Sequence, residues 1–272
     1  MQLSIRHTTR YSFSEPVVHA LQRLRLTPKE TQGQQILHWD MQYENASPQL
    51  EYDDQNFNTV TLLAVEPDAT EMTVTCSGTV QTQDKLGVIG RHAGHMPVWS
   101  FLGQTLITKL GPKLRDLLRE VGPVPNEEVL PFLHDLSARI SDKVAYTKGS
   151  TMVSTTAEEA VDSGTGVCQD HAHIFIGLAR ASNIPARYVS GYLMMDDRIE
   201  QEATHAWAEA HVAGLGWVGF DISNGCIPDP RYVRLATGRD YRDAAPITGI
   251  RYGTTEEVLS VNVAVTQQSG DQ

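Results

Sequence analysis

Cys168 is the residue in this sequence whose surroundings best suit nucleophilic chemistry. It follows the flexible run Gly164-Thr165-Gly166 and opens the segment CQDHAHIFIGLARAS, in which apolar residues recur at helical spacing. The first turn of a helix favours a thiolate, because unpaired N–H groups and the helix dipole stabilise negative charge there. The glycines allow a substrate to approach closely. We therefore predict that Cys168 attacks a carbonyl carbon as a thiolate.

A cysteine that acts on an amide also needs a base, which takes its proton and later protonates the leaving amine. Histidine suits this task near pH 7. His205 opens the strand-like run HAWAEAH, in which His205, Trp207 and Glu209 share one face and the alanines share the other. Small alanines suit close packing against the helix that carries Cys168. His205 is therefore the predicted base.

Asp221 lies near the end of the next strand-like run, GWVGFDI. A three-residue loop between the two runs places Asp221 opposite Trp207 and one diagonal step from His205 on the same face. A carboxylate at that position can orient the imidazole ring and stabilise its charged form. The residues thus predict a catalytic triad of Cys168, His205 and Asp221.

The remaining cysteines and the histidines near Cys168 have simpler interpretations. His171 lies one helical turn after Cys168 and, with His173, could belong to a metal site, but no second pair of ligands follows at a suitable spacing. We expect His173 to be a packed core histidine. Cys76 and Cys226 are expected to be free thiols, and the alternation around Cys76 predicts that it points into an N-terminal sheet.

The elements that position these residues can be predicted from their periodicity. Turn formers separate strand-like runs in the first 80 or so residues, and these runs predict an antiparallel β-sandwich. Helices are expected at 113–121, from Pro131 for about three turns, and at 168–182; a capping box at Thr156 and Glu159 opens a further short helix. Three strand-like runs follow, at 186–195, 204–212 and 216–222. A helix packed on an antiparallel sheet is an α+β arrangement.

Composition and charge exclude several classes of protein. Hydrophobic residues make up 40% and charged residues 20% of 272, as is typical of soluble globular proteins. The net charge of −11 argues against nucleic acid and anionic membranes as partners. No apolar run approaches the roughly 20 residues of a membrane span, and the first residues lack the apolar region of a secretion signal. We therefore expect a cytoplasmic protein, and three cysteines do not suggest a disulfide framework.

Two motifs resemble the transglutaminase-like superfamily in its bacterial members. GVCQDHAHIFIGLARASNIPARYVSGYL (166–193) and ATHAWAEAHVAGLGWVGFDISNG (203–225) are similar to the two core motifs of that family. The N-terminal strands and the segment GRDYRDAAPITGIRYG (238–253) are similar to the same family, so the resemblance spans nearly the whole chain. It implies an N-terminal β-sandwich (1–85), a connector with a short helix (86–130), and a papain-like or transglutaminase-like catalytic core with C-terminal strands (131–272).

By this resemblance, Cys168 is the nucleophile, His205 the base and Asp221 its orienting acid. Two positions depart from the family pattern. His171 stands where an aromatic residue is common, and Ile222-Ser223 replaces a more frequent Pro-Thr after the aspartate. Neither departure removes a member of the triad, although both can change the shape of the pocket.

The predicted reaction is acyl transfer from a peptide or protein amide through a Cys168 thioester that water resolves, as in a peptidase or amidase. Two alternatives remain open: an amine resolves the thioester, which is transglutamination, or the chain is a catalytically idle module that binds a peptide or partner. The backbone N–H of Cys168 is the natural first donor to the oxyanion, and Gln169 and Trp207 are candidates for the second. We expect no cofactor and no metal ion, calcium included.

Overall fold

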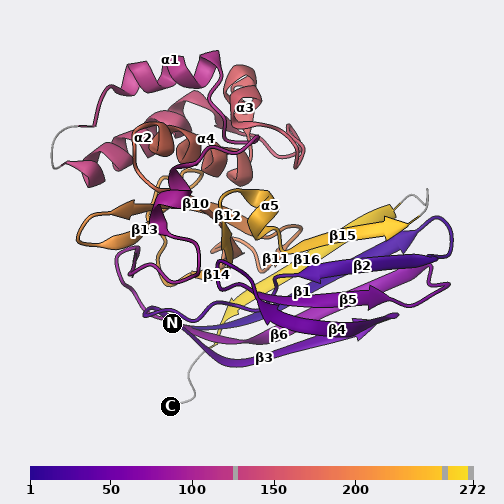
Figure 1. Cartoon of the computed structure of the whole chain (residues 1–272). Helices are drawn as coiled ribbons and strands as arrows, with labels where there is room; N and C mark the ends of the chain where they lie inside the picture. The colour runs from indigo at the N-terminus through magenta and orange to yellow at the C-terminus, as the bar shows by residue number, and fades with distance from the viewer. Residues whose placement is uncertain (125–127, 253–256, 269–272) are drawn as a thin grey trace.

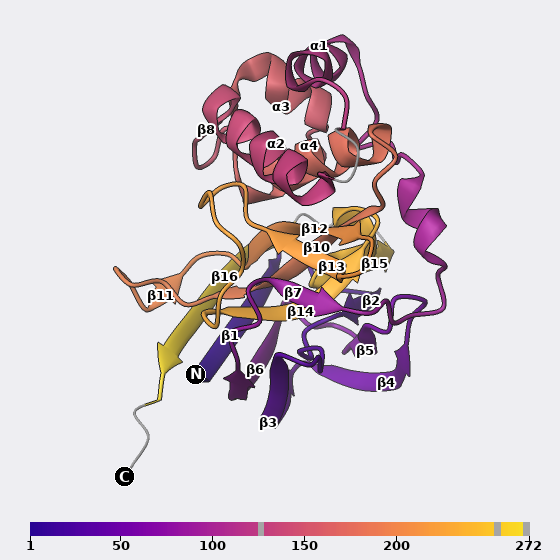
Figure 2. The ribbon, with the colours of Figure 1, turned by 90° about the vertical axis from the view of Figure 1, so that its left-hand side faces the viewer.

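The computed structural model describes residues 1–124, 128–252 and 257–268 and arranges them in three main parts (Figure 1). A group of helices covers one face of a five-stranded antiparallel sheet, and a β-sandwich lies against the other face. Figure 2 shows the same order from a second side, with the helices at the top and the sandwich below. The chain is therefore an α+β protein, as the sequence predicts.

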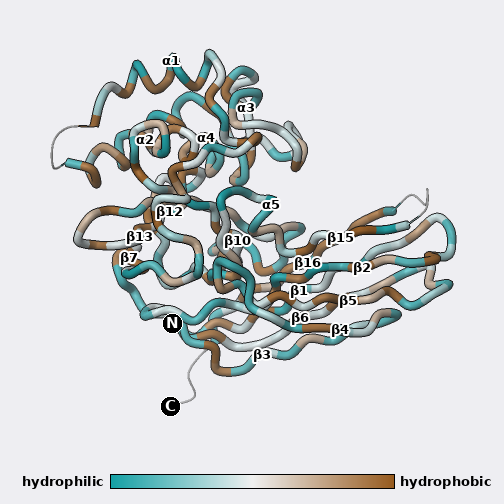
Figure 3. The backbone as a smooth tube through the Cα atoms, viewed as in Figure 1, coloured by the Kyte–Doolittle hydropathy of each residue, from teal (hydrophilic) through white to brown (hydrophobic). Residues whose placement is uncertain are grey.

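The sandwich consists of a five-stranded and a four-stranded antiparallel sheet. In order across the first sheet, the strands are β11 (Glu200–Gln201), β16 (Glu257–Gln267), β1 (Gln2–Phe13), β6 (Glu71–Thr82) and β3 (Gln34–Glu44). Across the second they are β15 (Ile247–Tyr252), β2 (His19–Leu24), β5 (Thr59–Val65) and β4 (Ala46–Asp53). Along β1 and β2, buried residues alternate with less buried ones, as strands with one face on a core require. Polar and apolar stretches interchange along these strands in Figure 3.

The closing strands of the chain belong to the sandwich, although the sequence places them with the catalytic core of 131–272. β16 pairs antiparallel with β1 along its whole length, and β15 pairs with β2. Val263 and Val265 of β16 are buried in the sandwich core, which explains why this strand returns to the N-terminal sheet. Residues 125–127 of the predicted connector and Gly253 of the last motif lie outside the described residues.

The rest of the chain is built on a second five-stranded sheet, called the core sheet, and the helices that cover it. Its strands, in order, are β14 (Tyr232–Gly238), β10 (Ala186–Leu193), β12 (His205–Val212), β13 (Gly216–Phe220) and β7 (Val88–Gly90). The helices are η1 (Val98–Leu102), α1 (Pro112–Val121), α2 (Val129–Lys143), α3 (Ala157–Ser163), α4 (Cys168–Ala181) and α5 (Tyr241–Ala244), and a short parallel pair joins β8 (Ala145–Tyr146) to β9 (Thr165–Gly166).

The central helix α4 begins at Cys168, where the sequence predicts it. Ala206, Ala208 and Ala210 of β12 face α4 in the core, so the alanine face of the strand packs against the cysteine-bearing helix, as predicted. The α3 helix has the predicted capping box, in which Thr156 Oγ1 accepts from the Glu159 N–H. The α2 helix begins at Val129, two residues before Pro131. Within the described residues, no helix has the length and apolar character that a membrane span requires.

A buried cluster of three charges lies on the sheet face opposite α4. The fully buried Glu209 carboxylate accepts from Arg187 Nε at 2.7 Å and from Arg234 Nε at 2.7 Å. Burial favours the neutral acid, but the two guanidinium groups outweigh it and hold the pKa of Glu209 below its ordinary value. The guanidinium of Arg187 also lies 4.0 Å above the ring of Trp217. The cluster thus links three strands of the core sheet through charge rather than through apolar contact.

We expect Glu209→Ala to lower the free energy of unfolding by about 3–5 kcal/mol, because removal of one partner leaves two buried guanidinium groups uncompensated. Denaturant unfolding followed by circular dichroism measures this loss. Asp135→Ala is the control, because it breaks an ion pair with Arg139 whose side chains are both about half exposed, and it should leave stability unchanged. Equal denaturant midpoints for Glu209→Ala and the wild type would show that the cluster contributes nothing to stability.

Candidate active site

The segment before α4 presents Cys168 at the first position of the helix. Asp170 Oδ2 accepts from the Val167 N–H at 2.8 Å and from Thr151 Oγ1 at 2.6 Å, which fixes the chain where it enters the helix. A Cβ atom at Gly166 would lie 2.9 Å from the Cβ of Asp170, so only glycine leaves room for this contact. Cys168 itself is partly exposed. Its N–H lies in the first turn, where the helix offers no acceptor.

The hairpin of β12 and β13 brings His205 and Asp221 together. Val212 pairs with Gly216 across a three-residue turn, and Ala208 pairs with Phe220. The predicted three-residue loop is confirmed, and one further step of this register would set Asp221 opposite Trp207. His205 Nε2 donates to Asp221 Oδ2 at 2.6 Å. The other ring nitrogen is then free to face the nucleophile, and Cys168 lies close enough for its charge to act on the His205 ring.

The charges of this site favour an imidazolium ion at His205. Burial by itself lowers the pKa of His205, but the Cys168 thiolate and the Asp221 carboxylate oppose it and raise the pKa to about 10. The pKa of Asp221 is shifted downward, whereas that of His205 is shifted upward. Burial of Asp221 favours the neutral acid, yet hydrogen bonds from His205 and other donors hold its pKa below the ordinary value. The shifts therefore favour an imidazolium at His205 and a carboxylate at Asp221.

Two residues that the sequence did not single out complete the surroundings of Asp221. Asn224 Nδ2 donates to Asp221 Oδ2 at 2.7 Å, and the hydroxyl of Tyr232 donates to the same oxygen at 2.8 Å. The backbone of Asp221 is also fixed, because it forms an antiparallel bridge with Cys226. Asn224 follows Asp221 closely in a turn-forming segment, which is a weak local signal. Nothing local links Tyr232 to Asp221.

Comparison with protein families accounts for both parts of this architecture. The family model described as the transglutaminase-like superfamily matches residues 117–222, a range that includes Cys168, His205 and Asp221. A second model, the bacterial transglutaminase-like N-terminal region, matches residues 3–81 of the sandwich. The chain belongs to the transglutaminase-like superfamily.

Several known proteins are similar to this chain. An uncharacterized protein of Mycobacterium bovis is 38% identical over 174 residues, which cover 59% of this chain and 55% of that protein, so the match spans about half its length. An uncharacterized protein of Mycobacterium leprae is 27% identical over 277 residues and covers 98% of this chain and 99% of its own. A crystal structure from Cytophaga hutchinsonii, described as that of a candidate cysteine protease, has a TM-score of 0.77 and 23% identity; it covers 100% of this chain and 92% of its own. This last likeness shows the fold.

The two departures from the transglutaminase-like pattern contact each other. His171 Nδ1 lies 2.8 Å from Ser223 Oγ, and His171 Nε2 lies 2.9 Å from the Val144 carbonyl oxygen. Because a carbonyl only accepts, Nε2 carries the proton and Nδ1 accepts from the serine hydroxyl. Burial lowers the pKa of His171, which keeps the ring neutral. His171 therefore ties α4 to the segment after Asp221, and both of its nitrogens are engaged in hydrogen bonds.

The other candidates that the sequence raises have structural roles. His173 is fully buried, its Nε2 accepts from the Tyr241 N–H at 3.1 Å, and burial lowers its pKa to about 3. Cys76 is buried in the sandwich core, as predicted. Cys226 is a partly buried free thiol, 3.3 Å from the hydroxyl of Tyr232. Among the described residues, no group of three or more His, Cys, Asp or Glu side chains could hold a metal ion.

Of the two candidates for the second oxyanion donor, Gln169 is engaged in another hydrogen bond and Trp207 is buried in the core sheet. Gln169 Nε2 donates to the Val153 carbonyl at 3.1 Å, so its amide holds a neighbouring loop. Trp207 Nε1 is buried and has no hydrogen-bond partner among the described residues. The six-membered ring of Trp207 packs on Gly191, and a Cβ atom there would lie 2.4 Å from it. The backbone N–H of Cys168 remains the candidate donor with the best placement.

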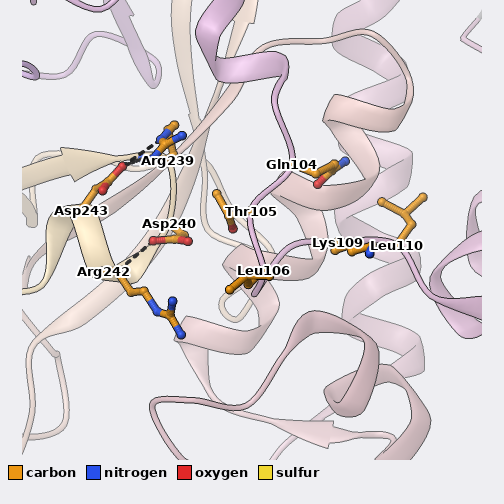
Figure 4. A pocket seen from close by; sticks show the side chains of 9 residues that line it. All are labelled: Gln104, Thr105, Leu106, Lys109, Leu110, Arg239, Asp240, Arg242 and Asp243. Carbon is orange, nitrogen blue, oxygen red and sulfur yellow. Dashed lines mark hydrogen bonds and ion pairs between the residues drawn. The ribbon is translucent and has the colours of Figure 1, made fainter.

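A separate surface hollow of about 750 Å³ lies between the η1–α1 segment and the β14–α5 turn (Figure 4). Gln104, from its rim, donates to the Gly177 carbonyl, and Arg180 near the end of α4 donates to the Arg239 carbonyl. The hollow is therefore near the C-terminal end of α4, whereas Cys168 begins that helix. None of the triad candidates lines it. Its lining residues are Gln104, Thr105, Leu106, Lys109, Leu110, Arg239, Asp240, Arg242 and Asp243.

We expect Cys168→Ala to lower the pKa of His205 well below 10, because the charge of the thiolate is the largest of the contributions that raise it. An NMR titration of the His205 ring measures this change directly. Cys76→Ala is the matched control, since it removes a thiol that lies in the sandwich core. Identical His205 titrations in the wild type and in Cys168→Ala would show that the two side chains do not form a charged pair.

Proposed function

We propose that this protein catalyses cysteine-dependent acyl transfer on a peptide or protein amide, with water as the acyl acceptor, and is therefore a peptidase or amidase. The observation that carries the proposal is the hydrogen bond between His205 and the fully buried Asp221 carboxylate, beside the partly exposed Cys168, whose charge acts on the same histidine. This is the arrangement that nucleophile, base and orienting acid require.

The proposed reaction has two halves. In the first, the Cys168 sulfur attacks the amide carbonyl carbon, and the C–N bond then breaks as the His205 imidazolium gives its proton to the leaving amine. This leaves a thioester on Cys168 and a neutral imidazole. In the second, the imidazole takes a proton from water as the water oxygen attacks the thioester carbonyl. The C–S bond breaks, a carboxylic acid is released, and the thiolate–imidazolium pair forms again.

Asp221 remains a carboxylate throughout these steps. It orients the His205 ring and stabilises the imidazolium form, so its effect falls on the proton transfers and not on the bond to carbon. The oxyanion that develops on the substrate carbonyl faces the first turn of α4, where the N–H of Cys168 lies. The helix dipole adds to this stabilisation.

A peptide substrate is supported by the exposed apolar side chains near Cys168. Met152 is 77% exposed and Val153 is 63% exposed, in a loop that Thr151 and Gln169 tie to the start of α4. Tyr146 is about half exposed, and the centroid of its ring lies 6.2 Å from that of His171, one helical turn after Cys168. Single exposed apolar residues are ordinary, but three beside a nucleophile suit an apolar side chain of a peptide.

Mass spectrometry can separate the two possible acyl acceptors. We expect incubation with glutamine-containing peptides to give hydrolysed products with Cys168 as the labelled residue in trapped intermediates, whether or not a primary amine is present. Cys168→Ala should give neither products nor intermediates. Incorporation of the amine into the peptide in place of hydrolysis would contradict the role of water and identify a transglutaminase instead.

We expect Asp221→Asn to lower kcat by roughly 10³-fold or more, because an amide cannot stabilise the imidazolium and favours the wrong tautomer of His205. Steady-state kinetics on a peptide amide that the wild type cleaves measures the effect. Asp162→Asn is a suitable control, since Asp162 lies exposed on α3 and pairs with the exposed Lys113. Equal kcat values for Asp221→Asn and the wild type would remove Asp221 from the mechanism.

A further inference from the structure

The hydroxyl of Tyr232 contacts Asp221 although Tyr232 belongs to the edge strand β14 of the core sheet. Tyr232 is the first residue of β14, and β10 and β12 lie between β14 and the strand that precedes Asp221. The Tyr232 ring packs beside two side chains of β12. Its centroid lies 5.4 Å from that of Trp207 and 6.0 Å from that of His205. The hydroxyl donates to Asp221 Oδ2, the oxygen that also accepts from His205.

The N-terminal sandwich holds β14 in place through side-chain amides. β10 pairs with one edge of β14. Toward the sandwich, Gln34 accepts from the Arg234 N–H at 2.8 Å and donates to the Arg234 carbonyl at 2.9 Å. Asn58 makes the same two contacts with Thr237, at 2.8 and 2.9 Å. Each side-chain amide thus makes the two hydrogen bonds that a neighbouring strand would make, because it satisfies both the N–H and the C=O of one residue of β14.

A third contact fixes the chain just before β14. Thr82, the last residue of β6 in the sandwich, donates from Oγ1 to the Pro230 carbonyl at 2.6 Å. Pro230 stands two residues before Tyr232. Three side chains of the sandwich therefore fix the backbone on both sides of this tyrosine, and each of them is buried.

We propose that Tyr232 is a positioning residue for the His205–Asp221 pair and that the N-terminal sandwich supports the active site by holding the strand that carries it. The proposal rests on the proposed function, because it assigns a role to the same acid. A fully buried carboxylate that loses one of its donors rotates toward groups that can replace it, and this rotation misaligns the oxygen that accepts from His205.

A purely structural role is the competing explanation, since Tyr232 also packs with Val189, Leu193 and Trp207 in a small apolar cluster. Tyr232→Phe separates the two, because it keeps the ring and removes only the hydroxyl. The matched control is Tyr192→Phe. Tyr192 is an equally buried tyrosine of the core sheet whose hydroxyl lies 2.9 Å from His7 Nδ1, away from the triad.

We expect Tyr232→Phe to lower the pKa of His205 in an NMR titration and to lower kcat on a peptide amide about tenfold or more, with KM within about twofold of the wild type. Tyr192→Phe should change neither value. An unchanged His205 titration and an unchanged kcat in Tyr232→Phe would overturn the positioning role. The titration needs no turnover, so it tests this role even if the wild type cleaves no amide, which would count against the proposed function alone.

Gln34→Met tests the contribution of the sandwich, because it removes the amide and keeps a side chain of similar length. We expect a smaller decrease of the His205 pKa and of kcat in the same direction as for Tyr232→Phe. If Gln34→Met titrates and turns over as the wild type does while Tyr232→Phe is impaired, the supporting role of the sandwich is wrong. Thermal unfolding of each variant shows that the comparison is made on folded protein.

Discussion

The hydrogen bonds to one oxygen of Asp221 are the constraint on which the candidate active site depends. A fully buried carboxylate is costly unless donors surround it, and here His205, Asn224 and Tyr232 supply them from three separate segments. Each donor can be in place only if its own element is in place. The site is therefore an outcome of the whole core sheet, and one local motif could not create it.

The layers of the fold follow from this requirement and from the packing of α4. The alanine face of β12 lets the cysteine-bearing helix lie close to the sheet, and the opposite face carries His205, Trp207 and Glu209. That second face needs a cover, which the sandwich provides. Because β15 and β16 return to the sandwich from the end of the chain, the sequence of the core is inserted between two segments that together form the sandwich.

Much of the local structure could be predicted from the sequence, because its determinants lie close together in the chain. The helix that starts at Cys168, the capping box at Thr156, the three-residue turn before Gly216 and the buried face of Cys76 all depend on neighbours within a few residues. The assignment of Cys168, His205 and Asp221 as catalytic residues is still a prediction, which their proximity supports.

The sequence could not predict the contacts that join distant segments. Tyr232 carries no local signal, and Gln34 and Asn58 resemble ordinary polar residues until β14 lies beside them. The pairing of β15 and β16 with the sandwich could not be predicted either, because strand alternation shows which residues are buried but does not identify the partner strand. The contact between His171 and Ser223 explains how two departures from the family pattern occur together, but only the structure shows that they touch.

The rate of alkylation of each cysteine by iodoacetamide, measured against pH in the wild type and in His205→Ala, tests the central claim most directly. Burial raises the pKa of Cys76 to about 12 and also raises that of Cys226, so both should react slowly near neutral pH. We expect selective and rapid labelling of Cys168 that slows markedly in His205→Ala. Labelling of Cys168 no faster than that of an ordinary exposed thiol, with no effect of His205→Ala, would contradict the existence of an activated thiolate–imidazolium pair.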